Sequence, residues 1–292
     1  MSILGVDLSN HNANRGPVNF DELKAAGCGF AWLKATEGVD FVDPSVHAFA
    51  AGCVAAELPF AYYHFATPGG SRVPGGYKKW WDAQDEANDF LAALETLPPA
   101  PCFPILDFEW SGMDECLPDP RERARWCREW IAIVHAAHAS SGATDRARRA
   151  LELDPSDEGA RDAIERANAR AGVPSYVQFY SNPNYLYAVT LPDPVINLCP
   201  LWYARWTSPP PPFDPAWGWE KWDIWQYTDK GEIDGVTGRV DLNTCESLEP
   251  VTFDRRPPQL SPSQRIKRSV RKIRRQCDEL ALVAAELERG GF

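Results

Sequence analysis

Short apolar runs with strand character alternate along this chain with helix-forming stretches, and this alternation restricts its fold more than any other feature. The strand-like runs in the first two thirds are ILGVDLS, GFAWLKATEG, PFAYYHFA, PCFPILDFEW and SYVQFYSN. Helix-forming sequence falls between them in DELKAAG, in HAFAAGCVAAE, and over residues 80–96 and 120–140. Repeated alternation of strand and helix predicts a parallel sheet, open or closed into a barrel, and we favour the barrel.

The pattern changes past position 195. Strand-like pieces follow one another there through Pro-rich and Gly-rich loops, with little helical sequence between them: LCPLWYARW, WDIWQYT and GRVDLN. We therefore expect an α/β fold over residues 1–250, an irregular TIM-like β/α barrel of about eight strands whose last strands have few helices.

Two further stretches do not follow the barrel pattern. Residues 141–172 are polar and rich in Ala, Arg and Glu, which predicts a helical insertion in the barrel. Residues 251–264 predict a linker, and residues 265–292 a basic amphipathic C-terminal helix with apolar side chains spaced three and four apart. Such a helix must cover its apolar stripe, so we expect self-association or docking, or binding to an anionic surface through its basic face.

Composition narrows the partners and the compartment. Residues 254–292 hold ten Lys/Arg against five Asp/Glu, whereas residues 1–253 hold 20 against 36. Phosphate binding needs clustered Lys and Arg, so we expect the acidic residues 1–253 not to bind nucleic acid. No apolar run reaches the roughly 18 residues of a transmembrane helix. The start, MSILGVDLSNHN, lacks the basic and apolar regions of a signal peptide, so we expect a chain that begins in a cytosol.

Cysteine and tryptophan usage bears on the core. The eight cysteines form no C-x-x-C pair, which predicts buried free thiols rather than a disulfide framework or a metal site. Of the twelve tryptophans, six fall between Trp202 and Trp225. Most are expected in the core, although aromatic faces can also stack on sugar rings.

Polar residues recur near the C-terminal ends of the predicted strands. In a parallel barrel these ends share one rim, where barrel active sites lie. In chain order the candidates are Asp7, Glu37, His64, Asp107 with Glu109, Tyr180, Arg205, Gln226 and Asp241. A single strand-end Asp is often only a helix cap, but several carboxyl groups after apolar strands indicate chemistry. His64 fits a catalytic base and a hydrogen-bonded structural histidine equally well.

The segment LDFEW is the sharpest local feature. Asp107 and Glu109 stand two apart on a strand, so both face the same side, about 6.5 to 7 Å apart at the backbone. Two acids in an apolar setting repel each other, which raises the pKa of one while the other stays ionised. That division of roles suits glycoside hydrolysis. A metal site or a salt-bridged surface edge stays open, although five histidines without an HExxH spacing give a metal little support.

Taken in order, GVDLSNHN, GFAWLKATEG, AYYHFA, ILDFEW, LWYARW and IWQYTDKGEIDGVTGRVDLN resemble the family 25 glycoside hydrolases, the N-acetylmuramidases typified by fungal, bacterial and phage lysozymes. The last block is the most specific, and LDFEW matches the family's D-x-E. The resemblance implies an irregular β/α barrel that cleaves the β-1,4 bond between N-acetylmuramic acid and N-acetylglucosamine in bacterial peptidoglycan. It implies no metal or organic cofactor.

The resemblance also assigns roles. It implies that Glu109 is the general acid, with Asp107, Asp7 and Asp241 as the accompanying catalytic carboxylates. Substrate contacts are implied for Tyr63, Tyr180, Trp202 and Gln226, and we expect them also for the strand-end residues Glu37, His64 and Arg205. The partner is then the glycan strand of peptidoglycan. The expected cellular role is that of a phage endolysin held in the host cytoplasm until release, or of a virion-associated wall enzyme.

Two alternatives stay open beside this hypothesis. One is a catalytically silent module that binds peptidoglycan or belongs to a virion. The other is a hydrolase of a different N-acetylated glycan, such as chitin.

Overall fold

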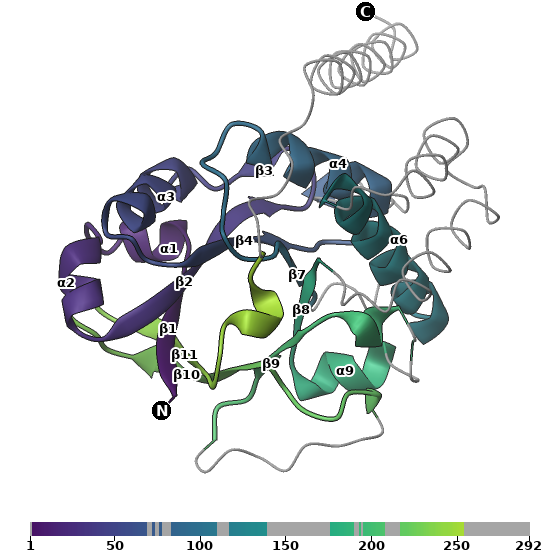
Figure 1. Ribbon diagram of the computed structural model, residues 1–292. Helices are drawn as coiled ribbons and strands as arrows, with labels where there is room; N and C mark the ends of the chain where they lie inside the picture. The colour runs from purple at the N-terminus through teal and green to yellow at the C-terminus, as the bar shows by residue number, and fades with distance from the viewer. Residues whose placement is uncertain are drawn as a thin grey trace, which may run out of the picture. The chain divides into compact units, whose positions relative to one another are not determined.

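Eight strands close into a barrel in the computed structural model, which describes residues 2–68, 72–73, 76–77, 83–109, 117–138, 176–189, 193, 195–207 and 217–253. Around the barrel they pair in the order β1 (Ile3–Leu8), β2 (Cys28–Glu37), β4 (Phe60–Phe65), β7 (Ile105–Asp107), β8 (Gln178–Ser181), β9 (Leu201–Ala204), β10 (Ile224–Gly231) and β11 (Val240–Cys245). The pairing of β11 with β1 completes the ring. The predicted irregular TIM-like barrel is therefore confirmed (Figure 1).

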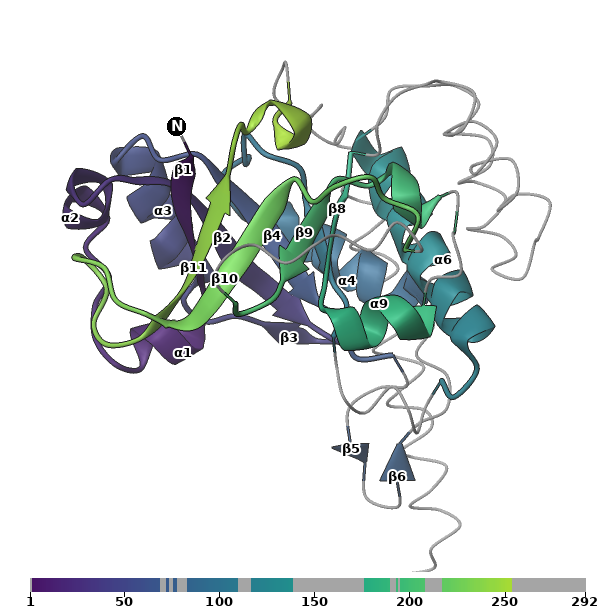
Figure 2. The same cartoon turned by 90° about the horizontal axis from the view of Figure 1, so that it is seen from below.

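One strand departs from the parallel arrangement that the sequence predicts. All neighbouring barrel strands are parallel except β11, which is antiparallel to β10 and to β1. Figure 2 shows β11 between these two strands. Residues 232–239 join β10 to β11 without a helix, which confirms the expected scarcity of helices there. The assumption that the eighth strand ends at the same rim as the others is wrong, because β11 begins there.

Helices pack outside the barrel (Figure 1). Four fall in segments that the sequence predicts to be helical: α2 (Phe20–Ala25), α3 (Val46–Ala55), α4 (Ala83–Leu94) and α6 (Pro120–His138). Helix α9 (Pro183–Val189) is not predicted. The remaining elements are short: α1 (Asn10–Ala13), β3 (Phe41–Val42), β5 (Arg72–Val73), β6 (Gly76–Tyr77) and the 3₁₀ helices η1 (Ile196–Leu198) and η3 (Glu249–Val251). Strand β3 pairs with the end of β2, and β5 pairs with β6.

Side chains alternate along the strands between two apolar clusters. One cluster fills the barrel interior and includes Trp32, Tyr63, Ile105, Tyr180 and Trp202. The other lies between the strands and the helices and includes Leu33, Tyr62, Leu106, Phe179 and Tyr203. The twofold repeat of strand geometry imposes this alternation. It therefore decides which polar residues of each strand can meet inside the barrel.

Close packing inside the barrel explains one glycine. On β1, a Cβ at Gly5 would lie 2.2 Å from the ring of Phe30. Gly5 thus leaves the space that this interior aromatic side chain fills, two residues before Asp7 on the same face of the strand.

The described cysteines are free and buried, as predicted: Cys28, Cys53, Cys102, Cys127, Cys199 and Cys245. Cys116 and Cys277 lie outside the described residues. No helix among the described ranges combines the length and the apolar character needed to cross a membrane.

Two predicted segments fall outside what the structure describes. These are the insertion at 141–172 and the tail at 265–292. The predicted linker, 251–264, is described only for its first three residues, and these still bind to the barrel. The Phe103 amide donates to the Val251 carbonyl (2.7 Å), and the Phe253 amide donates to the Pro101 carbonyl (3.0 Å).

Candidate active site

Asp107 and Glu109 lie together at one end of the barrel, as their spacing predicts. Asp107 is the last residue of β7, and Glu109 follows it by two positions. Phe108, between them, points to the opposite side and packs in the outer apolar cluster. The alternation that buries Phe108 among the helices thus directs both carboxyl groups to the barrel interior.

Asp7 and Asp241 form a second carboxyl pair. Asp7 is near the C-terminal end of β1, and Asp241 is the second residue of β11. The two residues are direct partners in the antiparallel β1–β11 register. Because β11 runs antiparallel, its start and not its end brings Asp241 to the rim where β1 ends. The expectation of Asp241 at a strand end is corrected, while its place at the rim is as predicted.

Amide side chains hold Asp7 in place. Its Oδ2 accepts hydrogen bonds from Gln226 Nε2 (3.0 Å) and Asn243 Nδ2 (2.8 Å). Asn243 Oδ1 in turn accepts a hydrogen bond from Trp202 Nε1 (2.7 Å). Burial raises the pKa of Asp7, while its hydrogen bonds with Asn243, Gln226 and Asp241 act in the opposite direction. Donors of this kind favour the charged form of a carboxyl group.

The Asp7–Asp241 pair shares a proton. Burial, followed by the negative charge of Asp7, raises the pKa of Asp241 to about 8. Two carboxyl groups in contact cannot both ionise easily. Because Asp7 has the amide donors, we assign the charge to Asp7 and the proton to Asp241 near neutral pH.

The Asp107–Glu109 pair is also built to hold a proton. Asp107 is 5% exposed, and its Oδ1 has no hydrogen-bond partner among the described residues. Burial, and then the charge of Glu109, raise the pKa of Asp107 well above its usual range. Burial likewise raises the pKa of Glu109, whose Oε2 accepts a hydrogen bond from Asn182 Nδ2 (3.1 Å). A carboxyl pair that retains a proton near neutrality meets the requirement for general acid catalysis.

Gln226 connects the carboxyl groups to an exposed aromatic ring. Its Oε1 accepts hydrogen bonds from Tyr180 Oη (3.1 Å) and from Trp206 Nε1 (3.2 Å). Trp206 is 57% exposed, which is unusual for so large an apolar side chain. The hydrogen bond fixes an indole at the rim, where its face is accessible to a ligand.

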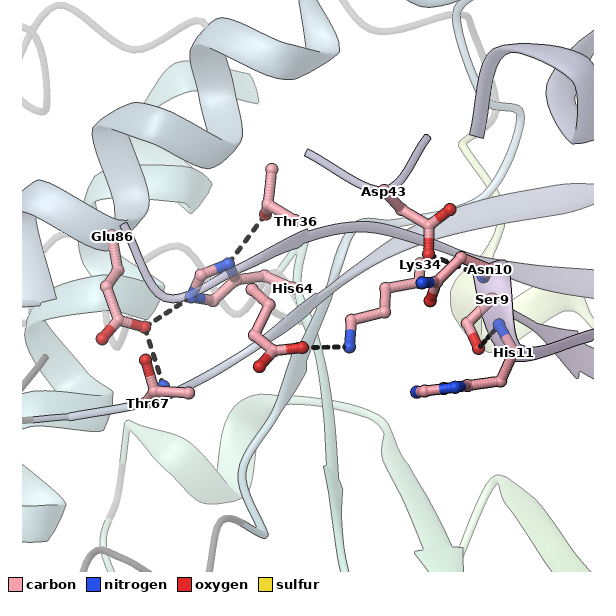
Figure 3. A network of polar contacts seen from close by, with 10 residues as sticks. Ser9, Asn10, His11, Lys34, Thr36, Asp43, His64, Thr67 and Glu86 are labelled. Atoms are coloured by element: carbon pink, nitrogen blue, oxygen red, sulfur yellow. Dashed lines mark hydrogen bonds and ion pairs between the residues drawn. The ribbon is translucent and has the colours of Figure 1, made fainter. Parts of the chain in front are cut away.

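His64 belongs to a separate hydrogen-bond network with Thr36 and Glu86 (Figure 3). His64 is fully buried on the outer side of β4, where its ring stacks on Trp130 of α6 at 5.4 Å. Its Nδ1 lies 2.8 Å from Thr36 Oγ1, and its Nε2 lies 2.7 Å from Glu86 Oε2 of α4. Of the two interpretations of His64, catalytic base or structural histidine, the structure supports the second, because the buried ring has no direct access to a substrate.

The other expected substrate contacts differ in exposure. Trp202 is 1% exposed and packs inside the barrel against Tyr63 and Tyr180, so it supports Asn243 rather than presenting a face to a ligand. Arg205 has an exposed side chain just beyond β9. Glu37 is partly exposed and forms an ion pair with Lys34, with 2.5 Å between Oε2 and Nζ.

Four residues of the site are absent from the sequence-based predictions: Lys34, Asn182, Trp206 and Asn243. The sequence could have indicated Asn243 and Asn182, since each stands two residues beyond a predicted site residue and therefore lies on the same face of the chain. The sequence could also have indicated Lys34, because it is a charged residue inside an otherwise apolar strand. The sequence could not have indicated Trp206, because nothing in LWYARW distinguishes the exposed tryptophan from the buried one.

The alternatives for LDFEW can now be compared with the geometry. A salt-bridged surface edge is excluded, because Asp107 is buried. Within the described ranges, no group of three or more His, Cys, Asp or Glu side chains is arranged to hold a metal ion.

Comparison with known proteins agrees with this geometry. The family model "Glycosyl hydrolases family 25" matches residues 6–236. Lysozyme M1 of Streptomyces globisporus is 25% identical over 244 residues, which is 82% of this chain and 67% of that protein. Among solved structures, the Clostridium perfringens spore cortex lytic enzyme SleM superposes with a TM-score of 0.58 at 25% identity, covering 86% of this chain and 69% of that one.

A phage protein shares the fold as well. The catalytic domain of endolysin ply40, from bacteriophage P40 of Listeria monocytogenes, has a TM-score of 0.55 at 23% identity and covers 85% of this chain and 96% of that one. The family match ends at residue 236, so the place of Asp241 in the site rests on the β1–β11 register. With a family model that spans most of the barrel and covers Asp7, Asp107 and Glu109, the chain belongs to the glycosyl hydrolases of family 25.

Proposed function

We propose that this glycoside hydrolase is a lysozyme-type muramidase, which hydrolyses the β-1,4 bond between N-acetylmuramic acid and N-acetylglucosamine in bacterial peptidoglycan. Membership of family 25 supports the reaction class, and the similarity to lysozyme M1 supports the substrate. The observation that carries the proposal is the arrangement of four carboxyl groups as two proton-holding pairs at one end of the barrel.

Glu109 is the general acid in this proposal. It is less deeply buried than Asp107, and Asn182 orients its carboxyl group. Its raised pKa keeps a proton available for the leaving glycosidic oxygen. Asp107, on the same face, forms the second member of this carboxyl pair and lies where its ionised form would stabilise positive charge on the sugar ring. Acid catalysis of this type needs neither a metal nor an organic cofactor.

Asp7 and Asp241 act on the other side of the reacting sugar. The amide donors fix the orientation of the Asp7 carboxylate. Its negative charge is therefore already in place to stabilise the positive charge that develops on the sugar ring. Asp241 retains the proton of the pair and can donate a hydrogen bond, for example to an acetamido oxygen of the substrate. Tyr180, Gln226 and Trp206 then contact the sugar chain through hydrogen bonds and an aromatic face.

Hydrolysis of two polymers by the purified full chain tests the proposal. We expect release of reducing sugar from peptidoglycan and not from chitin, and a loss of at least about 100-fold in rate for Glu109→Gln. Release from chitin at a similar rate would identify a different glycan substrate. Binding to peptidoglycan without release would identify a silent wall-binding module. Near-normal turnover by Glu109→Gln would remove the acid assignment.

The cellular role is a finer proposal. We propose that the enzyme serves as a phage endolysin that is held in the host cytoplasm until the membrane is permeabilised. The sequence resemblance to phage lysozymes among others supports it. Immunodetection in fractionated infected cells and in purified virions tests this role. A signal in the virions would instead favour a virion-associated wall enzyme.

A further inference from the structure

An irregularity in β2 brings Lys34 and Glu37 onto the same side of the strand. Residues three apart on a regular strand face opposite sides. In the parallel pairing with β4, Lys34 is opposite Tyr63, whereas Thr36 is already opposite His64, so Ala35 is an extra residue. This bulge turns Thr36 outward to His64 and leaves both Lys34 and Glu37 facing the barrel interior. Bulges commonly redirect side chains next to active sites.

Lys34 is held firmly in this position. It is 6% exposed, its Nζ contacts Glu37 Oε2 at 2.5 Å, and it lies 4.7 Å from the centre of the Phe65 ring and 5.8 Å from that of Phe41. Figure 3 shows Lys34 with its ion pair, separate from the hydrogen bonds around His64. An ammonium group enclosed by two rings and one carboxylate has little freedom to move.

The strand register places this ammonium group next to the Asp107–Glu109 pair. Phe65 on β4 is the direct partner of Glu37 on one side and of Asp107 on the other. Lys34, which packs on the Phe65 ring, therefore lies beside the end of β7. The positive charge of Lys34 acts on both Asp107 and Glu109.

We propose that Lys34, held by Glu37 and Phe65, is a positioning residue that keeps a negative charge on the Asp107–Glu109 pair at the pH where the enzyme works. The proposal rests on the muramidase function proposed above and adds to it a residue that touches no reacting atom. Glu37 is then the anchor of Lys34, in addition to the substrate contact expected from the sequence.

Charge effects support this assignment. The positive charge of Lys34 lowers the pKa of Asp107 and of Glu109, against the burial that raises both. Glu37 acts in the opposite direction and raises the pKa of Asp107. The ionisable groups that face this cluster come from β1, β2, β4, β7, β8 and β11 and their ends: Asp7, Lys34, Glu37, Tyr63, Asp107, Glu109, Tyr180 and Asp241.

Changes at Lys34 and Glu37 should move the pH–rate profile in opposite directions. Lys34→Met removes the positive charge, so the acidic limb of kcat/KM should move up by about one pH unit or more. Glu37→Gln leaves the Lys34 charge unopposed, so the same limb should move down. Lys34→Arg keeps the charge and should stay near the wild-type profile. Lys24→Met, on the surface helix α2, is the matched control and should not move the profile.

The outcomes separate this inference from the proposed function. An inactive wild-type chain would overturn the muramidase proposal itself. An active wild type whose acidic limb stays in place in both Lys34→Met and Glu37→Gln, or moves the same way in both, would overturn the role of Lys34. Circular dichroism shows which variants are folded. If Lys34→Met does not fold, Lys34→Gln takes its place, and an acidic limb that does not move up in that variant overturns the role of Lys34.

Discussion

Asp241→Asn should make the protein more stable at neutral and alkaline pH. In the folded state the pKa of Asp241 is raised from an ordinary 3.8 to about 8 by burial and by Asp7. The folded chain therefore holds this proton more tightly than the unfolded chain does. The contribution of Asp241 to the free energy of unfolding is fully present below pH 3.8 and is lost as the pH rises through about 8. Asparagine cannot ionise and can still donate a hydrogen bond to Asp7, so the variant avoids this loss.

The size of the effect follows from the pKa difference. Each pKa unit corresponds to about 1.4 kcal/mol, so the full difference would cost the wild type about 5 to 6 kcal/mol at alkaline pH. Asp241 is partly exposed and shares its proton with Asp7, which reduces this cost to on the order of 2 kcal/mol. For a barrel of this length the corresponding rise in Tm is about 4 to 8 °C.

Thermal unfolding of both proteins between pH 4 and pH 9 measures this difference. The two Tm values should be close near pH 4 and should separate as the pH rises, with the variant higher. Asp234→Asn, an exposed carboxyl group in the β10–β11 connection, is the control for the same chemical change and should show no such separation. A Tm difference that does not depend on pH, or a variant less stable than the wild type at pH 8, would refute the shared proton.

Three other changes test separate parts of the site. Trp206→Ala should raise KM several-fold with kcat largely kept, because an exposed ring contributes binding area rather than chemistry; a fall in kcat alone would contradict a sugar-stacking role. Exhaustive EDTA treatment should leave activity intact, and a loss restored by Mg²⁺ would point to a metal-dependent reaction. Deleting residues 256–292 should spare hydrolysis of short soluble glycans. Sedimentation and adsorption to anionic vesicles then show whether the tail self-associates or binds surfaces, and unchanged behaviour in both leaves docking on the barrel.

Strand periodicity was enough to predict the central part of the site. The two-residue spacing of Asp107 and Glu109 places both on one face, whatever the details of the barrel. The same alternation also applies to β4. Tyr63 and His64 are neighbours on β4 and cannot both face the interior, so the structural role of His64 was already the stronger expectation once Tyr63 was assigned to the site.

The direction of β11 was also within reach of the sequence. A parallel crossover needs a dozen or more residues, whereas the connection over 232–239 is too short and contains two glycines in the left-handed region, Gly235 and Gly238. An antiparallel hairpin is therefore the simple interpretation of DKGEIDGVTGR. The bulge at Ala35 had no comparable signal, because the sequence around it forms a continuous strand and only the pairing with β4 shows the extra residue.

Both departures from a regular parallel barrel bring an ionisable partner into the site. If β11 were parallel, Asp241, its second residue, would lie at the end of the barrel opposite Asp7, and the Asp7–Asp241 pair could not form. If β2 had no bulge, Glu37 would face away from Lys34, and the ammonium group would have no carboxylate to hold it beside Asp107. The regular part of the fold orients Asp7, Asp107 and Glu109, and the two irregularities add the partners that set where their protons reside. Variants that restore regularity at either place should therefore affect the pH dependence of catalysis more than the fold class.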